Sequence, residues 1–255
     1  MPRLERLLTS RGYEVGSSGQ VTLDTFARYF EHLRWESAAE PSLDLARMFT
    51  NGHRMVVRAQ QVQIDAAVGV GEQLRLKMWI GRIGRASMDI WHEAVLENTG
   101  RRAARGLVTA VYLGGDLRPS PVPDDFRAMI DDGDTAPIMV ASGADAPSGA
   151  WSYELRVRPS DIDIFHHVNH ANYAAFYEDA RTVAARSDVF GPRNSIAFRP
   201  AVRMAIDYRR EVLADDRLLI ASWRDATDPL VFHFDMRRAR DGERLSSART
   251  EVGSS

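Results

Sequence analysis

The 255-residue sequence contains no cysteine, and this absence excludes several kinds of chemistry. No disulfide can stabilise the fold, so the packing of apolar side chains must do so. Zinc sites built on thiolates are excluded, as are enzymes that use a cysteine nucleophile.

The sequence also lacks an excess of charge of either sign and a long hydrophobic run. Lysine and arginine together number 33 against 35 acidic residues, which gives a net charge of −2. We expect no nucleic-acid partner, because nucleic-acid-binding surfaces concentrate positive charge. No apolar stretch approaches the roughly 18 residues that a membrane-spanning helix needs, and the N-terminus shows no secretory signal pattern. The sequence therefore predicts a soluble, cytoplasmic protein without a membrane span.

A proline-rich stretch separates two segments of similar length. The composition of residues 119–150 is typical of a connection, with one short helix expected over residues 126–130. At 44% hydrophobic residues, each flanking segment is able to build a core. We predict an N-terminal domain over residues 8–118, a linker over 119–150 and a C-terminal domain over 151–255.

Both segments show the same order of predicted elements. A short strand comes first, one amphipathic helix follows, and alternating strand patterns come last. Apolar residues at helical spacing predict the helices around residues 26–33 and 173–184. Residues 74–78 and 231–234 have the patterns of antiparallel strands. We expect an α+β fold in which each half wraps an antiparallel sheet round its own central helix.

The two halves look like copies of one another. A shift of 147 positions aligns residues 26–34 with residues 173–181, with matching alanine, glutamate, arginine and aromatic positions (174 − 27 = 147). A shift of 144 aligns the later strands and pairs Trp79 with Trp223 (223 − 79 = 144). We infer a duplication whose two halves form an internal pseudo-dimer. Exposed sheet faces or edges would also be compatible with a homodimer.

A dense group of polar side chains precedes the second helix. Residues 158–173 read Arg-Pro-Ser-Asp-Ile-Asp-Ile-Phe-His-His-Val-Asn-His-Ala-Asn-Tyr. Free backbone N–H groups at a helix start can hold a developing oxyanion, and Asp163 lies just upstream of them. Asn169 and Asn172 could instead cap the helix.

This segment resembles the Asp-x-Asp-x-x-x-His-Val-Asn-x-x-x-Tyr motif of hot-dog fold thioesterases. From about residue 11 to residue 252, the chain is similar to the plant-type acyl-[acyl carrier protein] thioesterases, which contain two hot-dog halves and are related to 4-hydroxybenzoyl-CoA-type enzymes. The resemblance implies a tandem hot-dog fold and a hydrolase that converts a fatty acyl thioester to a free fatty acid and a thiol in lipid metabolism. It also implies that the enzyme needs no cofactor. Since no plastid-targeting extension is present, a bacterial relative is expected.

The resemblance places the family's catalytic residues on Asp163, His167 and Glu211. Asp163 is the expected general base on water, or the nucleophile that forms a mixed anhydride, and the sequence leaves both routes open. His167 would orient this carboxylate or polarise the carbonyl. Glu211, from a neighbouring strand, would hold the attacking water.

Further residues are expected to position the oxyanion and the substrate. The N–H groups near His167 and Val168 would hold the oxyanion, and Asn169 would organise the same loop. Phe165 stands where the plant-type family has an asparagine. In this respect the chain resembles the simpler single-domain acyl-CoA thioesterases. Val212 stands where many plant enzymes have a cysteine, so that thiol is dispensable if this chain is active.

The first half provides an internal comparison, because a purely structural motif should survive in both copies. The positions equivalent to the three catalytic residues hold Gly16, Gln20 and Ala67 (163 − 147 = 16; 167 − 147 = 20; 211 − 144 = 67). We therefore expect one active site, in the second half, with the first half as scaffold and pocket wall.

Several alternatives were weighed against this interpretation. His166 and His170 have the i, i+4 spacing of helical metal ligands, but no His-Glu-x-x-His motif is present and we expect no metal. Dinucleotide, phosphate-loop and Gly-x-Ser-x-Gly motifs are also missing. A hot-dog enoyl-thioester hydratase or dehydratase and a non-catalytic acyl-binding module remain alternatives. The substrate carrier, acyl-carrier protein or coenzyme A, is left open.

Overall fold

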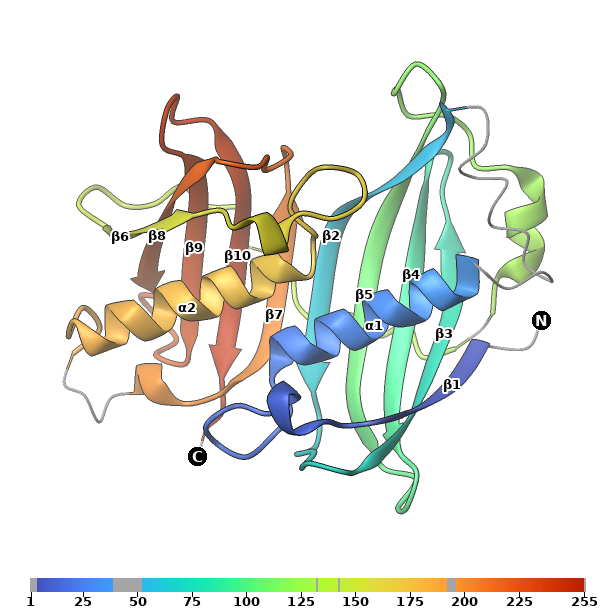
Figure 1. Ribbon diagram of the computed structural model, residues 1–255, viewed down its shortest axis with the longest axis horizontal. Coiled ribbons are helices and arrows are strands. Elements are labelled where there is room, and N and C mark those ends of the chain that lie inside the picture. The colour runs from blue at the N-terminus through green and yellow to red at the C-terminus, as the bar shows by residue number, and fades with distance from the viewer. Residues whose placement is uncertain (1–3, 39–51, 132, 142, 192–195, 255) are drawn as a thin grey trace. The chain divides into compact units, whose positions relative to one another are not determined.

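The computed structural model describes residues 4–38, 52–131, 133–141, 143–191 and 196–254. The chain divides into two compact units, Met1–Ile138 and Met139–Ser255, each with one long helix and a five-stranded antiparallel sheet (Figure 1). The boundary falls inside the predicted linker, so residues 119–138 belong to the first unit. Asp132 and Ser142 of that linker lie outside the described residues.

In the first unit the strands follow the order β1-β3-β4-β5-β2, and α1 lies across the sheet (Figure 1). Every neighbouring pair in this order is antiparallel. The elements are β1 (Leu4–Thr9), η1 (Gly12–Glu14), α1 (Leu23–Ala38), β2 (Arg54–Ile64), β3 (Gln73–Ile83), β4 (Ser87–Leu96), β5 (Arg102–Leu113) and η3 (Asp124–Met129).

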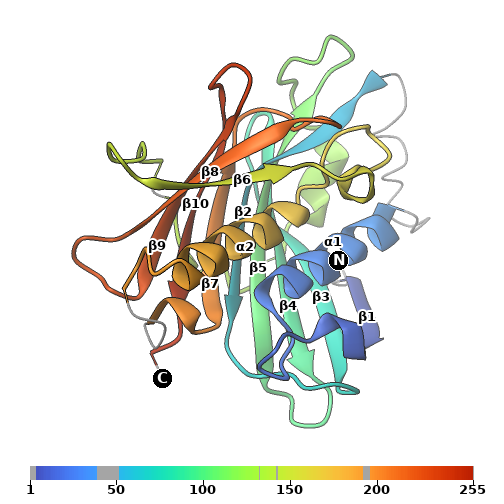
Figure 2. The same ribbon diagram turned by 60° about the vertical axis from the view of Figure 1, so that its left-hand side comes forward.

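In the second unit the order is β7-β10-β9-β8-β6, and α2 runs along one face of the sheet (Figure 2). These neighbouring strands are antiparallel as well. The elements are β6 (Trp151–Arg156), η4 (Pro159–Asp161), α2 (Asn172–Arg186), η5 (Ile196–Phe198), β7 (Ala201–Tyr208), β8 (Arg217–Arg224), β9 (Val231–Arg238) and β10 (Arg244–Val252).

Each helix buries its aromatic face against its own sheet. Phe26 and Phe30 of α1 are at most 1% exposed, as is Phe176 of α2. Tyr177 of α2 packs on Phe234 of β9 with ring centroids 5.2 Å apart. Both helices predicted from apolar spacing are confirmed. In each, the apolar residues form one face, and this face is buried.

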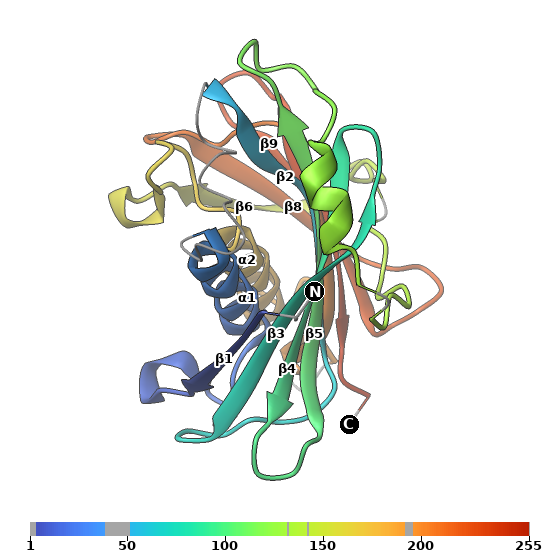
Figure 3. The ribbon, with the colours of Figure 1, turned by 90° about the vertical axis from the view of Figure 1, so that its right-hand side faces the viewer.

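The first part of the predicted linker is attached to the sheet. The short helix expected over residues 126–130 is the 3₁₀ helix η3, on the side of the sheet away from α1 (Figure 3). The Asp131 N–H then donates to the Ile80 carbonyl at 2.9 Å. A Cβ atom on Gly133 would lie 2.5 Å from the Trp79 indole, so the backbone passes directly over this ring.

Among the described residues, no helix is both long enough and apolar enough to cross a membrane.

The close approach of α1 to its sheet predicts the effect of adding one methyl group. A Cβ atom on Gly106 of β5 would lie 2.6 Å from Cδ2 of Phe30. We expect Gly106→Ala to lower the free energy of unfolding by about 1–3 kcal/mol, because overpacking forces ring and strand apart. Urea denaturation measures this, with Gly12→Ala as the control, since a Cβ at Gly12 meets nothing within 4 Å. Equal losses in both variants would contradict the prediction.

Candidate functional site

The predicted site residues lie on three short chain segments joined by backbone pairing, two of them just before α2 and the third after β7. Residues 161–163 pair with residues 167–169 through an antiparallel bridge between Ile162 and Val168. The second of these segments also pairs with residues 212–213, since the Val168 N–H donates to the Val212 carbonyl at 2.8 Å. Backbone hydrogen bonds therefore bring the three segments together.

The loop from Asp163 to His167 is closed by its own backbone. The Asp163 N–H donates to the His167 carbonyl at 2.9 Å, and the His166 N–H donates to the Asp163 carbonyl at 3.0 Å. His166 adopts a φ of 65°, a left-handed conformation that usually requires glycine. This reversal places the first and last side chains of the loop side by side.

Asp163 and His167 form the central pair of the site. Oδ2 of Asp163 lies 3.5 Å from Nδ1 of His167, and the two side chains are 15% and 29% exposed. The other carboxylate oxygen accepts the Phe165 N–H at 2.8 Å. The carboxylate is thus held in one orientation, partly screened from water, with one oxygen toward an imidazole. Such a group can act as a base or as a nucleophile.

Phe165 contacts the imidazole in place of the asparagine found in the plant-type family. Its ring stacks on His167 with centroids 5.9 Å apart and an interplanar angle of 26°. The side chain is 38% exposed. Phe165 therefore offers an apolar wall beside the pair, where an asparagine would offer hydrogen bonds.

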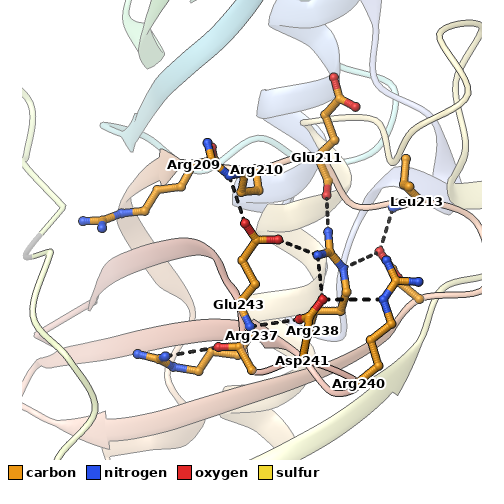
Figure 4. A network of polar contacts seen from close by, with 11 residues as sticks. Arg209, Arg210, Glu211, Leu213, Arg237, Arg238, Arg240, Asp241 and Glu243 are labelled. Atoms are coloured by element: carbon orange, nitrogen blue, oxygen red, sulfur yellow. Dashed lines mark hydrogen bonds and ion pairs between the residues drawn. The ribbon is translucent and has the colours of Figure 1, made fainter.

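Glu211 lies on the third segment, on the same side as the pair. His167 opposes Leu213 in an antiparallel bridge. Two residues further along this register, Asn169 lies opposite Glu211. Val168 and Val212 are 3% and 0% exposed and point into the core. Since neighbouring side chains alternate, those of His167 and Glu211 lie on the other face of the ladder. Figure 4 shows the Glu211 carboxylate directed away from the surrounding polar network, which contacts only its backbone carbonyl.

The helix start is arranged differently from the expectation. The Val168 N–H is engaged by the Val212 carbonyl, and α2 begins at Asn172. The expectation that the Val168 N–H holds an oxyanion is therefore wrong, because this N–H already has a backbone acceptor. Asn169 organises the turn before the helix, since its Oδ1 accepts the Ala171 N–H at 2.8 Å. Asn172 is not the cap, because Ala171 occupies the N-cap position and Asn172 is the first residue of the helix; its side chain donates to the Asp161 carbonyl at 3.2 Å.

Asp161, the first acid of the motif, anchors the loop and is 2% exposed. Its carboxylate accepts the Arg158 N–H and, at 2.8 Å from Nη2, the Arg158 guanidinium. These hydrogen bonds raise the pKa of the Arg158 side chain above its ordinary value. Asp161 thus has a structural role in this loop.

Tyr173 of α2 supports the third segment from the core. Burial raises the pKa of its phenol well above the ordinary value, and the nearby Glu211 carboxylate raises it further. The phenol also hydrogen bonds the Val212 backbone. Tyr173 stays protonated at neutral pH and is a support for this segment, not a base.

The first unit contains the same loop without the same side chains. The Gly16 N–H donates to the Gln20 carbonyl at 2.9 Å, as Asp163 does to His167. Gly19, at the position of His166, has a φ of 74°. Similarly, the Val21 N–H donates to the Val68 carbonyl at 2.8 Å. Since this backbone forms without an acid or a histidine, the loop's fold does not require Asp163 or His167.

The motif's other histidines do not form a metal cluster. Within the ranges that the structure describes, no three His, Asp or Glu side chains are grouped as metal ligands. His166 is an exposed turn residue, and the His170 carbonyl accepts the Tyr208 hydroxyl at 2.9 Å.

Sequence reasoning did not single out Arg238, whose guanidinium donates to the Glu211 carbonyl at 3.1 Å. The two residues are 27 positions apart, and no local pattern links them.

Two family models match consecutive parts of the chain. The thioesterase-like superfamily matches residues 16–130, and the acyl-ACP thioesterase C-terminal domain matches residues 146–253. A search of curated protein sequences finds no match.

Solved structures match over nearly the whole chain. The 12:0-ACP thioesterase from Umbellularia californica has a TM-score of 0.79 at 20% identity and covers 98% of this chain and 97% of its own. An acyl-ACP thioesterase from Bacteroides thetaiotaomicron has a TM-score of 0.76 at 16% identity, with 98% of each chain covered. An oleoyl thioesterase (putative) from Lactobacillus plantarum has a TM-score of 0.80 at 14% identity, with 100% and 98% covered. The tandem hot-dog fold expected from the sequence is confirmed.

The left-handed residue of the loop gives a test of its geometry. We expect His166→Gly to keep or raise the free energy of unfolding, by at most about 1 kcal/mol, because glycine adopts this conformation without strain. His166→Val should lower it by about 1–2 kcal/mol, because a branched side chain clashes there. Chemical denaturation compares the two variants. If valine is tolerated as well as glycine, the loop does not have this conformation in solution.

Proposed function

The chain belongs to the acyl-ACP thioesterase family of thioester hydrolases, and we propose that Asp163, His167 and Glu211 form its active site. The observation that supports this most strongly is the Asp163–His167 pair, 3.5 Å apart on a loop that the first unit repeats without either side chain. Side chains that the loop's fold does not need are best explained by chemistry.

In the proposed reaction, Asp163 acts as a general base: it removes a proton from water as the water oxygen adds to the thioester carbonyl carbon. The carbon–sulfur bond then breaks, and the departing thiolate takes up a proton to become the thiol. In the other route the carboxylate itself adds to the carbonyl, expels the thiolate and leaves a mixed anhydride that water cleaves. Both routes give one fatty acid and one thiol, and both fit a carboxylate with Oδ2 directed toward His167.

The neighbouring side chains have supporting roles in this proposal. His167, stacked on Phe165, orients the carboxylate of Asp163 through Nδ1. Glu211 lies on the same face of the three-segment ladder and is exposed, so its carboxylate is able to hold the attacking water.

The surroundings of the pair suit an apolar acyl chain. Ile164, in the turn after Asp163, is 72% exposed, Leu213, opposite His167 in the ladder, is 41% exposed, and Phe165 adds its ring. We propose an acyl-carrier protein thioester as the substrate, in keeping with the family, and a role in fatty acid biosynthesis. A bacterial origin, a cytoplasmic location, the pseudo-dimer and a homodimer stay predictions.

The central test removes the proposed base. We expect Asp163→Asn to lower kcat for thiol release by about 10²–10⁴-fold, because an amide cannot accept the proton or attack the carbonyl. Thiol release is measured with acyl-carrier proteins and acyl-CoAs of graded chain length. The control is Gln20→Ala, at the exposed position of the first unit's loop that is equivalent to His167, which should stay within about twofold of the parent enzyme.

Undiminished turnover by Asp163→Asn would remove Asp163 from the reaction. Enoyl-CoA supplied in the same assay separates the alternatives: hydration of the alkene would favour a hydratase, and acyl binding without turnover would favour a binding module.

A further inference from the structure

A buried arginine lies behind Glu211, on the side opposite its carboxylate (Figure 4). Arg238 ends strand β9, and its side chain is 9% exposed. Its guanidinium donates to the Glu211 carbonyl at 3.1 Å and to Asp216 at 3.2 Å. It also donates to Asp241 at 3.3 Å and to Glu243 at 2.5 Å.

Arg238 holds the Glu211 segment at two points. One is the direct hydrogen bond to the Glu211 carbonyl. The other runs through Asp216, whose carboxylate also accepts the Leu213 N–H at 3.0 Å and whose side chain is 2% exposed. Between these two points, the Val212 carbonyl accepts the Val168 N–H. The arginine thus fixes the strand-like segment that pairs with the catalytic loop.

The charge of Arg238 is already balanced. Asp216, Asp241 and Glu243 surround its guanidinium, and Arg210 pairs with Glu243 at 3.0 Å on the outer side. A guanidinium compensated in this way contributes hydrogen-bond geometry to its neighbours more than a free positive charge to a substrate.

The first unit shows what this region looks like without the arginine. Leu96 occupies the equivalent position: it pairs with Leu74 as Arg238 pairs with Leu218 (238 − 142 = 96; 218 − 144 = 74). The N–H of each closes a similar hairpin, onto the carbonyl of Arg101 or Glu243, at 2.9 Å.

The neighbouring segment of the first unit nevertheless keeps the same backbone contacts. The Val21 N–H donates to the Val68 carbonyl at 2.8 Å, and the Gly69 N–H donates to the Glu72 carboxylate at 2.5 Å. The position of Glu211 is Ala67 there (211 − 144 = 67). This backbone therefore forms in the unit that has leucine and alanine at the positions of Arg238 and Glu211.

We propose that Arg238 is a positioning residue that aims the Glu211 side chain at the Asp163–His167 pair. By fixing the Glu211 carbonyl, it sets the plane of that peptide and with it the direction of the Cα–Cβ bond. The proposal rests on the proposed active site, since Glu211 must take part in hydrolysis. Burying an arginine costs desolvation that the leucine of the first unit does not incur, which favours a role beyond packing.

The test compares buried Arg238 with Arg244, a partly buried arginine of the second unit. Arg244 is the matched control, because its side chain is 12% exposed and donates to Asp145 and to the Gly143 carbonyl at 3.1 and 3.0 Å. We expect Arg238→Met to lower kcat at least about tenfold while KM changes less than about twofold, because the thioester still binds but Glu211 is misaimed. Arg244→Met should lower stability to a similar extent and leave kcat within about twofold.

A double-mutant cycle shows whether Arg238 acts through Glu211. Glu211→Gln should itself lower kcat, and adding Arg238→Met should then cost less than about twofold more, because the side chain being aimed is gone. Multiplicative losses, or a parent-like kcat for Arg238→Met, would overturn the proposal. If Asp163→Asn is inactive while Arg238→Met is not, only the role of Arg238 fails; an active Asp163→Asn removes the proposed site.

A second variant covers the case in which methionine prevents folding. Arg238→Lys keeps the buried positive charge, but a single ammonium cannot hold Glu211 and Asp216 in the same two-point geometry. We expect a folded protein with reduced kcat and little change in KM. A parent-like kcat in this variant would overturn the role of Arg238.

Discussion

The site depends on one backbone hydrogen bond, from the Val168 N–H to the Val212 carbonyl. It joins the segment that follows the Asp163–His167 loop to a segment more than forty residues later, as the difference in numbering shows (212 − 168 = 44). Both valines are buried, so the core fixes their side chains on one face of the ladder. The neighbouring residues then have to present their side chains on the other face, and these neighbours include His167 and Glu211. Core packing on one face thus fixes where the proposed active-site side chains lie on the opposite face.

The duplicated architecture separates what the backbone needs from what the reaction needs. The first unit has the same closed loop, with Gly16, Gly19 and Gln20 at the places of Asp163, His166 and His167. Glycine adopts the left-handed conformation without steric strain, whereas histidine at this position costs about 1–2 kcal/mol of backbone energy. The second unit also carries a buried ion pair beside the site, between Arg238 and Asp216. Both features, the left-handed histidine and the buried ion pair, lie in the half that is proposed to catalyse the reaction.

The sequence predicted those parts of the fold that depend on neighbouring residues or on a shared motif. Apolar spacing identified both long helices, because a helix that buries one face must repeat its apolar residues every three or four positions. The repeat of element order and the motif at residues 158–173 indicated the tandem hot-dog fold. The short helix at Asp124–Met129 was also expected, but not its attachment to β3.

Contacts between distant segments were outside the reach of such patterns. The expectation that Val168 offers a free N–H was wrong, because this N–H pairs with the Val212 carbonyl. That pairing joins residues far apart in the sequence. Arg238 was not singled out for the same reason. Its contact with Glu211 joins the end of β9 to the segment that follows β7, and no local sequence pattern links these two places. A sequence shift between the copies could have pointed to it: aligning the hairpins at residues 96–101 and 238–243 places a buried arginine where the other copy has leucine. In a duplicated fold, a charged residue at a core position of one copy alone is therefore a physical signal of function.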